Sequence, residues 1–251
     1  MTSTPAILLI IAGLDPSGGA GLAADIETAV ALGVHPAPVA SLITVQDTVN
    51  VSASEPLAPE LVVDQAEAVL ADLPIAAIKL GALGTAAIGS AVADLLARHP
   101  DIAVVTDPVL AAAGGGRLAE SELIAVYRER LFPLSRLATP NREELALLAP
   151  EDGAAELLAL GLPACLVTDG EGRGDRIVHE LHTDEVHLVA NGPRLEGSFH
   201  GSGCTLASAI AARIALGDDL EEAIHRAGAF VQKAVAQAYQ PGQGQKVPKR
   251  W

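Results

Sequence analysis

The sequence predicts an α/β fold built on a largely parallel sheet, and two observations carry that prediction. The chain has 251 residues, of which 50% are hydrophobic but only 2% aromatic, so it can bury one large core of aliphatic side chains. Short unbroken apolar runs also alternate with longer helical patterns, and several runs end in glycine-rich turns. This alternation is typical of βαβ units, whose strands are covered by helices on both faces.

The individual elements follow from hydrophobic periodicity. A hairpin at the sheet edge is expected over residues 176–190, which alternate around Thr183-Asp184. No repeat, linker or low-complexity tract divides the sequence, so we expect one domain over residues 1–251, with a mobile tail at 240–251. Strands are expected at 6–12, 38–45, 75–79, 102–106 and 164–167, and helices at 22–32, 58–73, 85–98, 121–131, 204–216 and 220–239.

The charge balance excludes several classes of partner. The net charge is −15, from 31 acidic and 16 basic residues, which argues against nucleic acid and against an anionic membrane surface. Nucleotides remain possible ligands, because backbone N–H groups and Mg²⁺ can hold their phosphates. Two distant cysteines fit a reducing compartment, and no segment resembles a signal peptide or a membrane span. We therefore expect a cytoplasmic protein.

The stretch from Gly197 to Thr205 joins a glycine-rich loop directly to an apolar helix. The first N–H groups of such a helix have no intrahelical partner and carry a partial positive charge. Gly201, Ser202 and Gly203 are therefore candidates for an anion-binding loop. Cys204 would lie at the helix N-terminus, where the pKa of a thiol is lowered and the thiol can act as a base. An ordinary glycine-rich connection with an inert cysteine fits the stretch equally well.

Three further polar residues lie where ligands bind in open parallel sheets, near the carboxyl ends of strands. Gln46 follows the second expected strand, and its amide suits the edge of a heterocycle, although a turn residue would look the same. Asp107 follows the fourth strand and suits a metal or phosphate, the alternative being a turn before proline. Asp25 opens the first helix behind a glycine-rich turn, where it serves the site or only complements the helix dipole.

Six motifs occur in a specific order along almost the whole chain. They are Gly13-Leu-Asp-Pro-Ser-Gly-Gly-Ala-Gly21 with Ala24-Asp25, Thr44-Val-Gln46-Asp-Thr48, Lys79-Leu-Gly81, Asp107-Pro-Val109, Thr139-Pro-Asn141 with Glu144, and His200-Gly-Ser-Gly-Cys-Thr205. Each motif is weak alone. Together they resemble the ribokinase superfamily and, within it, the hydroxymethylpyrimidine/phosphomethylpyrimidine kinases of thiamine biosynthesis.

This resemblance implies a ribokinase-like, three-layer αβα sandwich with a mostly parallel central sheet. It implies ATP-dependent phosphorylation of 4-amino-5-hydroxymethyl-2-methylpyrimidine and then of its monophosphate to the diphosphate, with ATP as co-substrate and Mg²⁺ as cofactor. We expect a homodimer. A flexible segment at Gly114–Gly116 is expected to close over the substrate phosphate.

Site roles carry over residue by residue. The resemblance implies pyrimidine binding by Gly13, Asp25, Gln46, Ala82 and Val109, nucleotide binding by Thr168, Gly170 and Asn141, a metal at Asp107 and Glu144, and catalysis by Gly201, Ser202, Gly203 and Cys204. Cys204 occupies the position where the superfamily's sugar kinases carry an aspartate base.

Two departures leave the substrate open. Ala82 stands where the family has methionine, and Thr168 opens a segment closer to the pattern of sugar and pyridoxal kinases. Pyridoxal kinase, or a non-catalytic ligand-binding protein on the same fold, are the alternatives.

Overall fold

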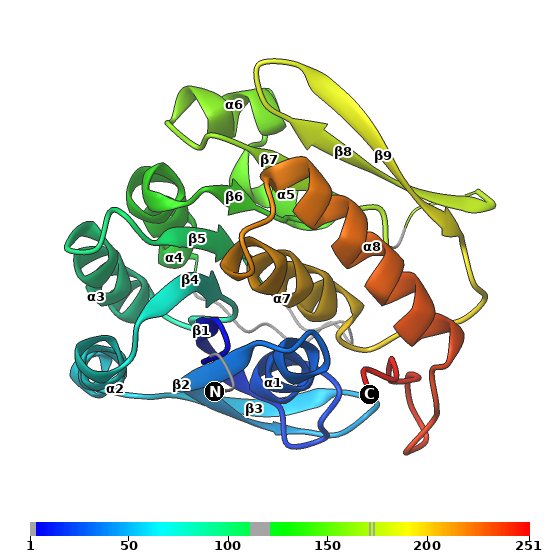
Figure 1. Cartoon of the computed structure of the whole chain (residues 1–251), viewed down its shortest axis with the longest axis horizontal. Helices are drawn as coiled ribbons and strands as arrows, with labels where there is room; N and C mark the ends of the chain where they lie inside the picture. The colour runs from blue at the N-terminus through cyan, green and yellow to red at the C-terminus, as the bar shows by residue number, and fades with distance from the viewer. Residues whose placement is uncertain (1–3, 111–120, 171, 173) are drawn as a thin grey trace.

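The computed structural model describes residues 4–110, 121–170, 172 and 174–251. Over these residues the chain forms the predicted sandwich, with one mixed sheet between two layers of helices (Figure 1). The segment Gly114–Gly116, expected to close over the substrate, lies outside the described residues. In sheet order the strands are β3 (Val51–Pro56), β2 (His35–Gln46), β1 (Ile7–Leu14), β4 (Ile75–Leu80), β5 (Ala103–Thr106), β6 (Leu137–Ala138), β7 (Cys165–Val167), β8 (Arg176–His182) and β9 (Val186–Pro193).

Six of these strands, β2, β1, β4, β5, β6 and β7, run parallel, whereas β3, β8 and β9 pair antiparallel. The antiparallel strands lie at the two edges of the sheet. One edge is the hairpin of β8 and β9 that the sequence predicted. Each outermost strand, β3 and β9, ends in a proline, Pro56 or Pro193. The mostly parallel sheet predicted from the sequence is confirmed.

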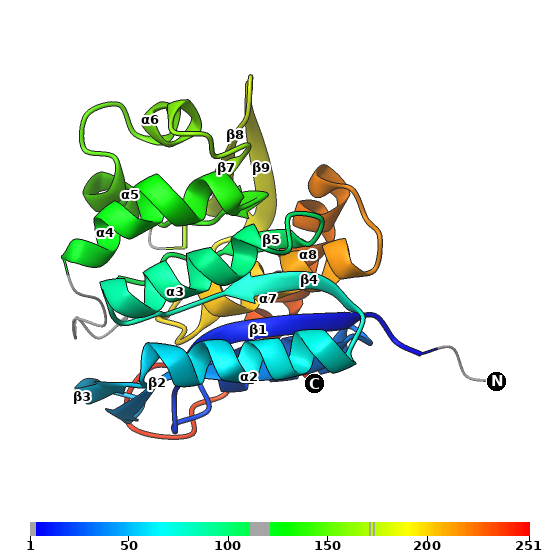
Figure 2. The ribbon, with the colours of Figure 1, turned by 90° about the vertical axis from the view of Figure 1, so that its left-hand side faces the viewer.

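Helices cover both faces of the sheet (Figure 2). One face carries α2 (Pro59–Asp72), α3 (Ala86–Ala97), α4 (Glu122–Val126), α5 (Arg142–Leu148) and α6 (Ala154–Ala159). The other face carries α1 (Gly21–Ala31), α7 (Ser202–Ala215) and α8 (Leu220–Ala236). Among the residues that the structure describes, no helix combines the length and apolar character needed to cross a membrane.

Strand β1 explains the first apolar run. Leu9 and Ile11 point into the core beneath α2 and α3, while Leu8 and Ile10 point into the core beneath α1 and α7. All four side chains have no exposed surface. Full burial of such a side chain contributes about 1.5–3 kcal/mol, so both layers depend on this strand.

Several elements differ from the sequence-based prediction. No strand was expected at β3, whose Ser-Ala-Ser centre has low strand propensity, and β6 is too short to leave a periodic signal. Helix α6 was also not predicted. The helix expected at 121–131 ends its α-helical part at Val126 and continues as a π-helix over Tyr127–Leu131.

The C-terminal tail is packed against the molecule, so the prediction that residues 240–251 are mobile is wrong. Val247 forms an isolated bridge with Tyr239, and Lys246 forms one with Phe199. Arg250 is only 2% exposed. Composition suggested mobility, but long-range hydrogen bonds hold this segment, and these leave no local pattern in the sequence.

Candidate active site

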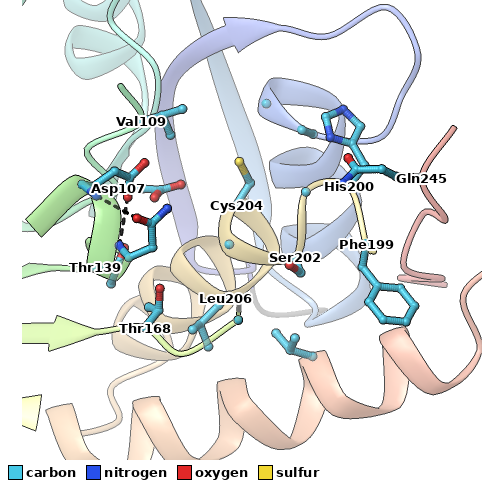
Figure 3. A pocket seen from close by; sticks show the side chains of 18 of the residues that line it. Asp107, Val109, Thr139, Thr168, Phe199, His200, Ser202, Cys204, Leu206 and Gln245 are labelled. Carbon is cyan, nitrogen blue, oxygen red and sulfur yellow. Dashed lines mark hydrogen bonds between the residues drawn. The ribbon is translucent and has the colours of Figure 1, made fainter. Parts of the chain in front are cut away.

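A cavity of about 770 Å³ opens at the carboxyl ends of the parallel strands, beside the N-terminus of α7 (Figure 3). Parallel sheets bind ligands in this position. The predicted site residues that line it are Gly13, Gln46, Ala82, Asp107, Val109, Asn141, Glu144, Thr168, Gly170, Gly201, Ser202, Gly203 and Cys204. Of the predicted set, Asp25 alone does not line the cavity.

The N-terminus of α7 presents its first N–H groups to this cavity. Gly201, the residue before the helix, has φ 80°, and no side chain caps the first turn. The loop passes so close to the Gly13–Gly21 turn that a Cβ on Gly201 would lie 2.0 Å from the Gly19 carbonyl oxygen. Glycine is therefore required here twice, for its backbone conformation and for the close approach.

A buried ionic cluster lies beneath the cavity. The Lys79 ammonium is 2.9 Å from Asp25 Oδ2 and 3.7 Å from Asp107 Oδ2, and Ser208 donates to Asp25 Oδ1 at 2.6 Å. Burial would lower the pKa of Lys79, but the facing carboxylates outweigh it and hold that pKa above its ordinary value. Lys79 therefore stays charged, and it neutralises carboxylates that would otherwise repel one another.

Asp25 belongs to this cluster and does not contact the cavity. Its side chain is completely buried, and both of its oxygens are bonded to protein groups. The expectation that Asp25 supplies a direct polar contact to the substrate is corrected accordingly: Asp25 holds Lys79 by an ion pair beneath the cavity. The position of Asp25 in the sequence could not show this, because Lys79 belongs to another element, strand β4.

Cys204 lies at the first turn of α7 as predicted, but the direction of its pKa shift is the opposite of the expected one. Burial, reinforced by the Asp107 charge, raises the pKa of the thiol to about 12, although Lys79 and the Gly21 N–H act against the shift. The helix terminus is therefore outweighed by desolvation and by a like charge. In the free protein Cys204 is a neutral thiol at pH 7.

Asp107 shows a matching perturbation. Burial raises its pKa, and Lys79 only partly offsets this. Its Oδ2 atom and the hydroxyl of Thr139 are both buried without a hydrogen-bond partner. Unsatisfied buried oxygens are rare in proteins, and here two line one cavity. A cation would provide the missing partner of Asp107 Oδ2, and a phosphate oxygen could accept from the Thr139 hydroxyl.

The predicted metal ligand Glu144 has a structural task as well. Its Oε2 accepts from the Asn141 N–H at 2.9 Å, while Asn141 Oδ1 accepts from the Glu144 N–H at 2.8 Å. These two bonds form a capping box that starts α5. Among the described residues, no three histidine, cysteine or acidic side chains gather as a ready metal site, so a Mg²⁺ ion here would depend on phosphate and water ligands in addition to Asp107 or Glu144.

A hydrogen-bonded network that sequence reasoning missed lies at the end of the cavity lined by Gln46. His200 Nε2 lies 2.7 Å from Asp15 Oδ2 and 2.8 Å from Gln46 Nε2. Burial raises the pKa of Asp15, but hydrogen bonds from His200 and Ser17 outweigh it and leave the pKa below its ordinary value. Asp15 is therefore charged and fixes His200, whose Nε2 also lies against the Gln46 amide. One ring nitrogen can donate to Asp15 or accept from Gln46, but it cannot do both at once. Asp15 lies in the Gly13–Gly21 motif and His200 in the His200–Thr205 motif, so these motifs could have indicated both residues from the sequence.

The opposite end of the cavity is lined by Thr168, Gly170 and helix α8. Arg194 holds the loop after β7, because it pairs with Asp169 at 2.6 Å and donates to the carbonyl oxygen of Gly170 at 3.0 Å. His179 Nδ1 accepts from the Asp169 N–H at 2.9 Å, and burial lowers the pKa of His179 to about 4. A neutral His179 and the contacts of Arg194 hold Asp169 and Gly170 at this end of the cavity.

The sandwich and this site define a class of protein: a small-molecule phosphotransferase on a ribokinase-like fold. The N-terminus of α7, suited to bind an anion, lies between the two ends of its cavity. The chain belongs to the phosphomethylpyrimidine kinase family, whose model matches residues 15–249. The resemblance noted in the motifs is thereby confirmed, and the chain is a kinase.

Individual relatives agree with this assignment. The hydroxymethylpyrimidine/phosphomethylpyrimidine kinase of Rhizobium meliloti is 37% identical over 244 residues, covering 93% of this chain and 91% of the relative. A bifunctional thiamine biosynthesis protein of Geobacter sulfurreducens is 36% identical. The match spans 94% of this chain but only 50% of the relative's length.

Solved structures show the same fold. The ADP complex of Bacillus subtilis pyridoxal kinase superposes with a TM-score of 0.90 at 26% identity over 98% of both chains. A phosphomethylpyrimidine kinase from Clostridium difficile superposes with a TM-score of 0.78 at 29% identity, covering 91% of this chain and 99% of the other.

Proposed function

We propose that this kinase transfers a phosphoryl group from ATP to the hydroxymethyl group of 4-amino-5-hydroxymethyl-2-methylpyrimidine, and then to the resulting monophosphate. The observation that carries the proposal is the position of the α7 N-terminus between two differently lined ends of one cavity. Gln46 and Gly13 line the end with heterocycle-binding chemistry, and Thr168 and Gly170 line the other. In-line transfer needs this arrangement more than it needs covalent help from the protein.

The pyrimidine is assigned to the end lined by Gln46, Gly13, Ala82 and Val109. The Gln46 amide lies 2.8 Å from His200 Nε2 and can offer both a donor and an acceptor to a ring edge. A Cβ on Gly13 would meet Leu42 at 2.8 Å and the Ala82 Cβ at 3.7 Å, so Ala82 forms part of the same wall. A small side chain at Ala82 leaves more space for a ring than the methionine of the relatives would.

ATP is assigned to the end formed by Thr168, Gly170, Asn141 and helix α8. Its transferred phosphoryl group would meet the N–H groups of Ser202, Gly203 and Cys204, which have no capping side chain. Mg²⁺, when bound near Asp107 and Glu144, would neutralise charge on the phosphates. Asp107 Oδ2, which has only the Lys79 ammonium at 3.7 Å and no hydrogen bond, supports this assignment.

Cys204, in its thiolate form, is assigned as the group that receives the proton of the attacking hydroxyl. Its thiol faces the cavity close to Asp107 (Figure 3), and preorganised N–H groups beside it stabilise the transferred charge. Because the pKa of the thiol lies near 12 in the free protein, the thiolate is scarce at pH 7. The backbone N–H groups therefore supply a larger share of the catalysis than the sequence suggested.

A substrate panel tests the proposal. ADP release with Mg²⁺ is measured for the hydroxymethylpyrimidine, its monophosphate and pyridoxal. We expect kcat/KM for the pyrimidine to exceed that for pyridoxal by at least tenfold, and a tenfold preference for pyridoxal would overturn the substrate. The pyridoxal kinase fold of the solved relatives keeps that comparison necessary. Ligand binding without ADP release would point to a non-catalytic protein.

The assembly and location follow as further parts of the proposal. We propose a single-domain, cytoplasmic homodimer that binds neither nucleic acid nor membranes. Ile43 and Val45 on β2, with Val49 beyond it, are large apolar side chains that are 46–62% exposed, which supports an interface on that face. Sedimentation velocity of the wild type and of Val45→Glu would test the dimer.

A further inference from the structure

The buried arginine Arg250, near the end of the packed tail, contacts both loops that face the substrate end of the cavity. Its Nη2 donates to the Gly19 carbonyl oxygen at 2.6 Å, and its Nε donates to the Thr205 hydroxyl at 2.9 Å. Its Nη1 pairs with Glu27 at 3.0 Å. One rigid guanidinium therefore joins the Gly13–Gly21 turn, helix α1 and helix α7.

The contact with Thr205 continues to the anion-binding loop. The Thr205 hydroxyl accepts from Arg250 and donates to the Gly201 carbonyl oxygen at 2.7 Å. Gly19, the other backbone partner of Arg250, is the residue whose carbonyl packs directly on Gly201. Arg250 thus holds both sides of the closest approach between the two loops.

Neighbouring tail residues bind the remaining parts of the same end. Lys246 accepts from the His200 N–H at 2.8 Å through its carbonyl oxygen, and its own N–H donates to Ser198 at 3.1 Å. Gln245 donates its N–H to the Thr48 carbonyl oxygen, two residues beyond Gln46, at 2.9 Å. All three loops around the proposed pyrimidine end are therefore tied to one terminal segment.

A buried ion pair is poorly explained by stability alone. Taking charges out of water is expensive, and apolar replacements of buried pairs are often neutral or stabilising. The Glu27 partner of Arg250 is itself 36% exposed, which weakens the attraction further. What the guanidinium supplies, and an apolar side chain would not, is a planar set of donors with fixed directions.

We propose that Arg250 is a positioning residue: it sets the spacing between the Gly13–Gly21 turn and the Gly201–Thr205 loop, and so aligns the substrate hydroxyl with the anion-binding N–H groups. Its effect on catalysis rests on the proposed function, whereas its effect on the loops does not.

The experiment measures the loops directly by hydrogen–deuterium exchange and then measures activity. In Arg250→Met, we expect amides in segments 15–20 and 201–205 to exchange at least tenfold faster, with β1 and β4 unchanged. The matched control is Arg213→Met, because Arg213 also pairs with a carboxylate, Asp218 at 2.6 Å, but at the far end of α7. That variant should leave both segments unchanged. Equal exchange of wild type and Arg250→Met in both segments, or the same change in the control, overturns the proposal.

Activity is measured well below the melting midpoint of each variant. We expect Arg250→Met to lose at least tenfold in kcat/KM for the hydroxymethyl substrate, with KM for ATP within twofold of the wild type. We expect added guanidinium to restore part of the activity of Arg250→Ala. Loss without guanidinium rescue assigns Arg250 a merely structural role. If the protein phosphorylates none of the tested heterocycles, the exchange result still decides the proposal.

A second pair of variants covers the case in which Arg250→Met fails to fold. Thr205→Val removes the hydroxyl that joins Arg250 to Gly201, whereas Thr205→Ser keeps it. We expect faster exchange at 201–205 for valine and wild-type exchange for serine, and identical behaviour of the two variants overturns the proposal.

Discussion

Substituting Gly201 by alanine tests two structural demands made on this position, because one control glycine shares only its backbone conformation and another shares neither demand. Gly201 has φ +80°, and an added Cβ would lie 2.0 Å from the Gly19 oxygen and 2.9 Å from the Ala20 Cα. Gly217 has φ +94° with nothing within 4 Å. Gly203 has no unusual φ and open space around its Cβ position.

The magnitudes follow from these differences. A left-handed conformation costs an alanine about 1–2 kcal/mol, so Gly217→Ala should be destabilised by about that amount. Gly201→Ala bears the same cost, and its Cβ also forces backbone atoms apart, which adds about 1–3 kcal/mol. Gly203→Ala lies in the first turn of α7, where alanine is the better helix former by up to about 1 kcal/mol.

Urea unfolding at pH 7 measures all three variants. We expect the free energy of unfolding to fall by about 2–5 kcal/mol for Gly201→Ala, by about 1–2 kcal/mol for Gly217→Ala, and not at all for Gly203→Ala. If Gly201→Ala is no less stable than Gly217→Ala, then the close contact with Gly19 contributes nothing and the reasoning about the two loops fails.

Three further predictions concern titration and binding. Gln46→Ala should weaken pyrimidine binding by about 1–3 kcal/mol and leave KM for ATP unchanged, and an equal loss for both substrates would make Gln46 structural. Cys204→Ala should lower kcat by less than the roughly 10²–10⁴-fold that a base tuned to the working pH contributes, because the pKa of Cys204 is about 12. In Cys165→Ala the alkylation of Cys204 should keep rising above pH 9 for the same reason, and a plateau near pH 7 would contradict this. The pKa of His179 is about 4 in the folded protein and 6.5 for an ordinary histidine. The neutral side chain therefore contributes its full share of the folding free energy above pH 6.5, and about 3 kcal/mol of it is lost as the pH falls toward 4. His179→Asn should remove that loss in urea titrations, and an unchanged pH dependence would assign it to other groups.

The sequence predicted the parts of the site that are local. The turn after β1, the residue after β2 and the start of α7 each combine a strand or helix boundary with glycine or polar residues, and such combinations can be recognised within about ten positions. Cys204 and Gln46 line the cavity for this reason.

What sequence reasoning missed depends on contacts between distant segments. Lys79 on β4 meets Asp25 because helix α1, which carries Asp25, packs on β1, the neighbour of β4 in the sheet. Arg250 reaches Gly19 across 231 residues. The raised pKa of Cys204 has the same origin, since it comes first from burial and then from Asp107, which follows β5. Burial and neighbouring charge are properties of the folded chain, so a helix-terminus argument alone gave the wrong direction.

The prolines that end β3 and β9 bear on how the protein behaves when crowded. An exposed sheet edge offers unpaired N–H and C=O groups that can recruit a strand of another molecule and begin aggregation. Pro56 and Pro193 carry no N–H to offer, and register shifts interrupt the ladders beside both edges, between Val45 and Gln46 and between Ile177 and Val178. The sheet therefore resists extension at either end, and two copies of the chain would associate through a face of the molecule without merging their sheets.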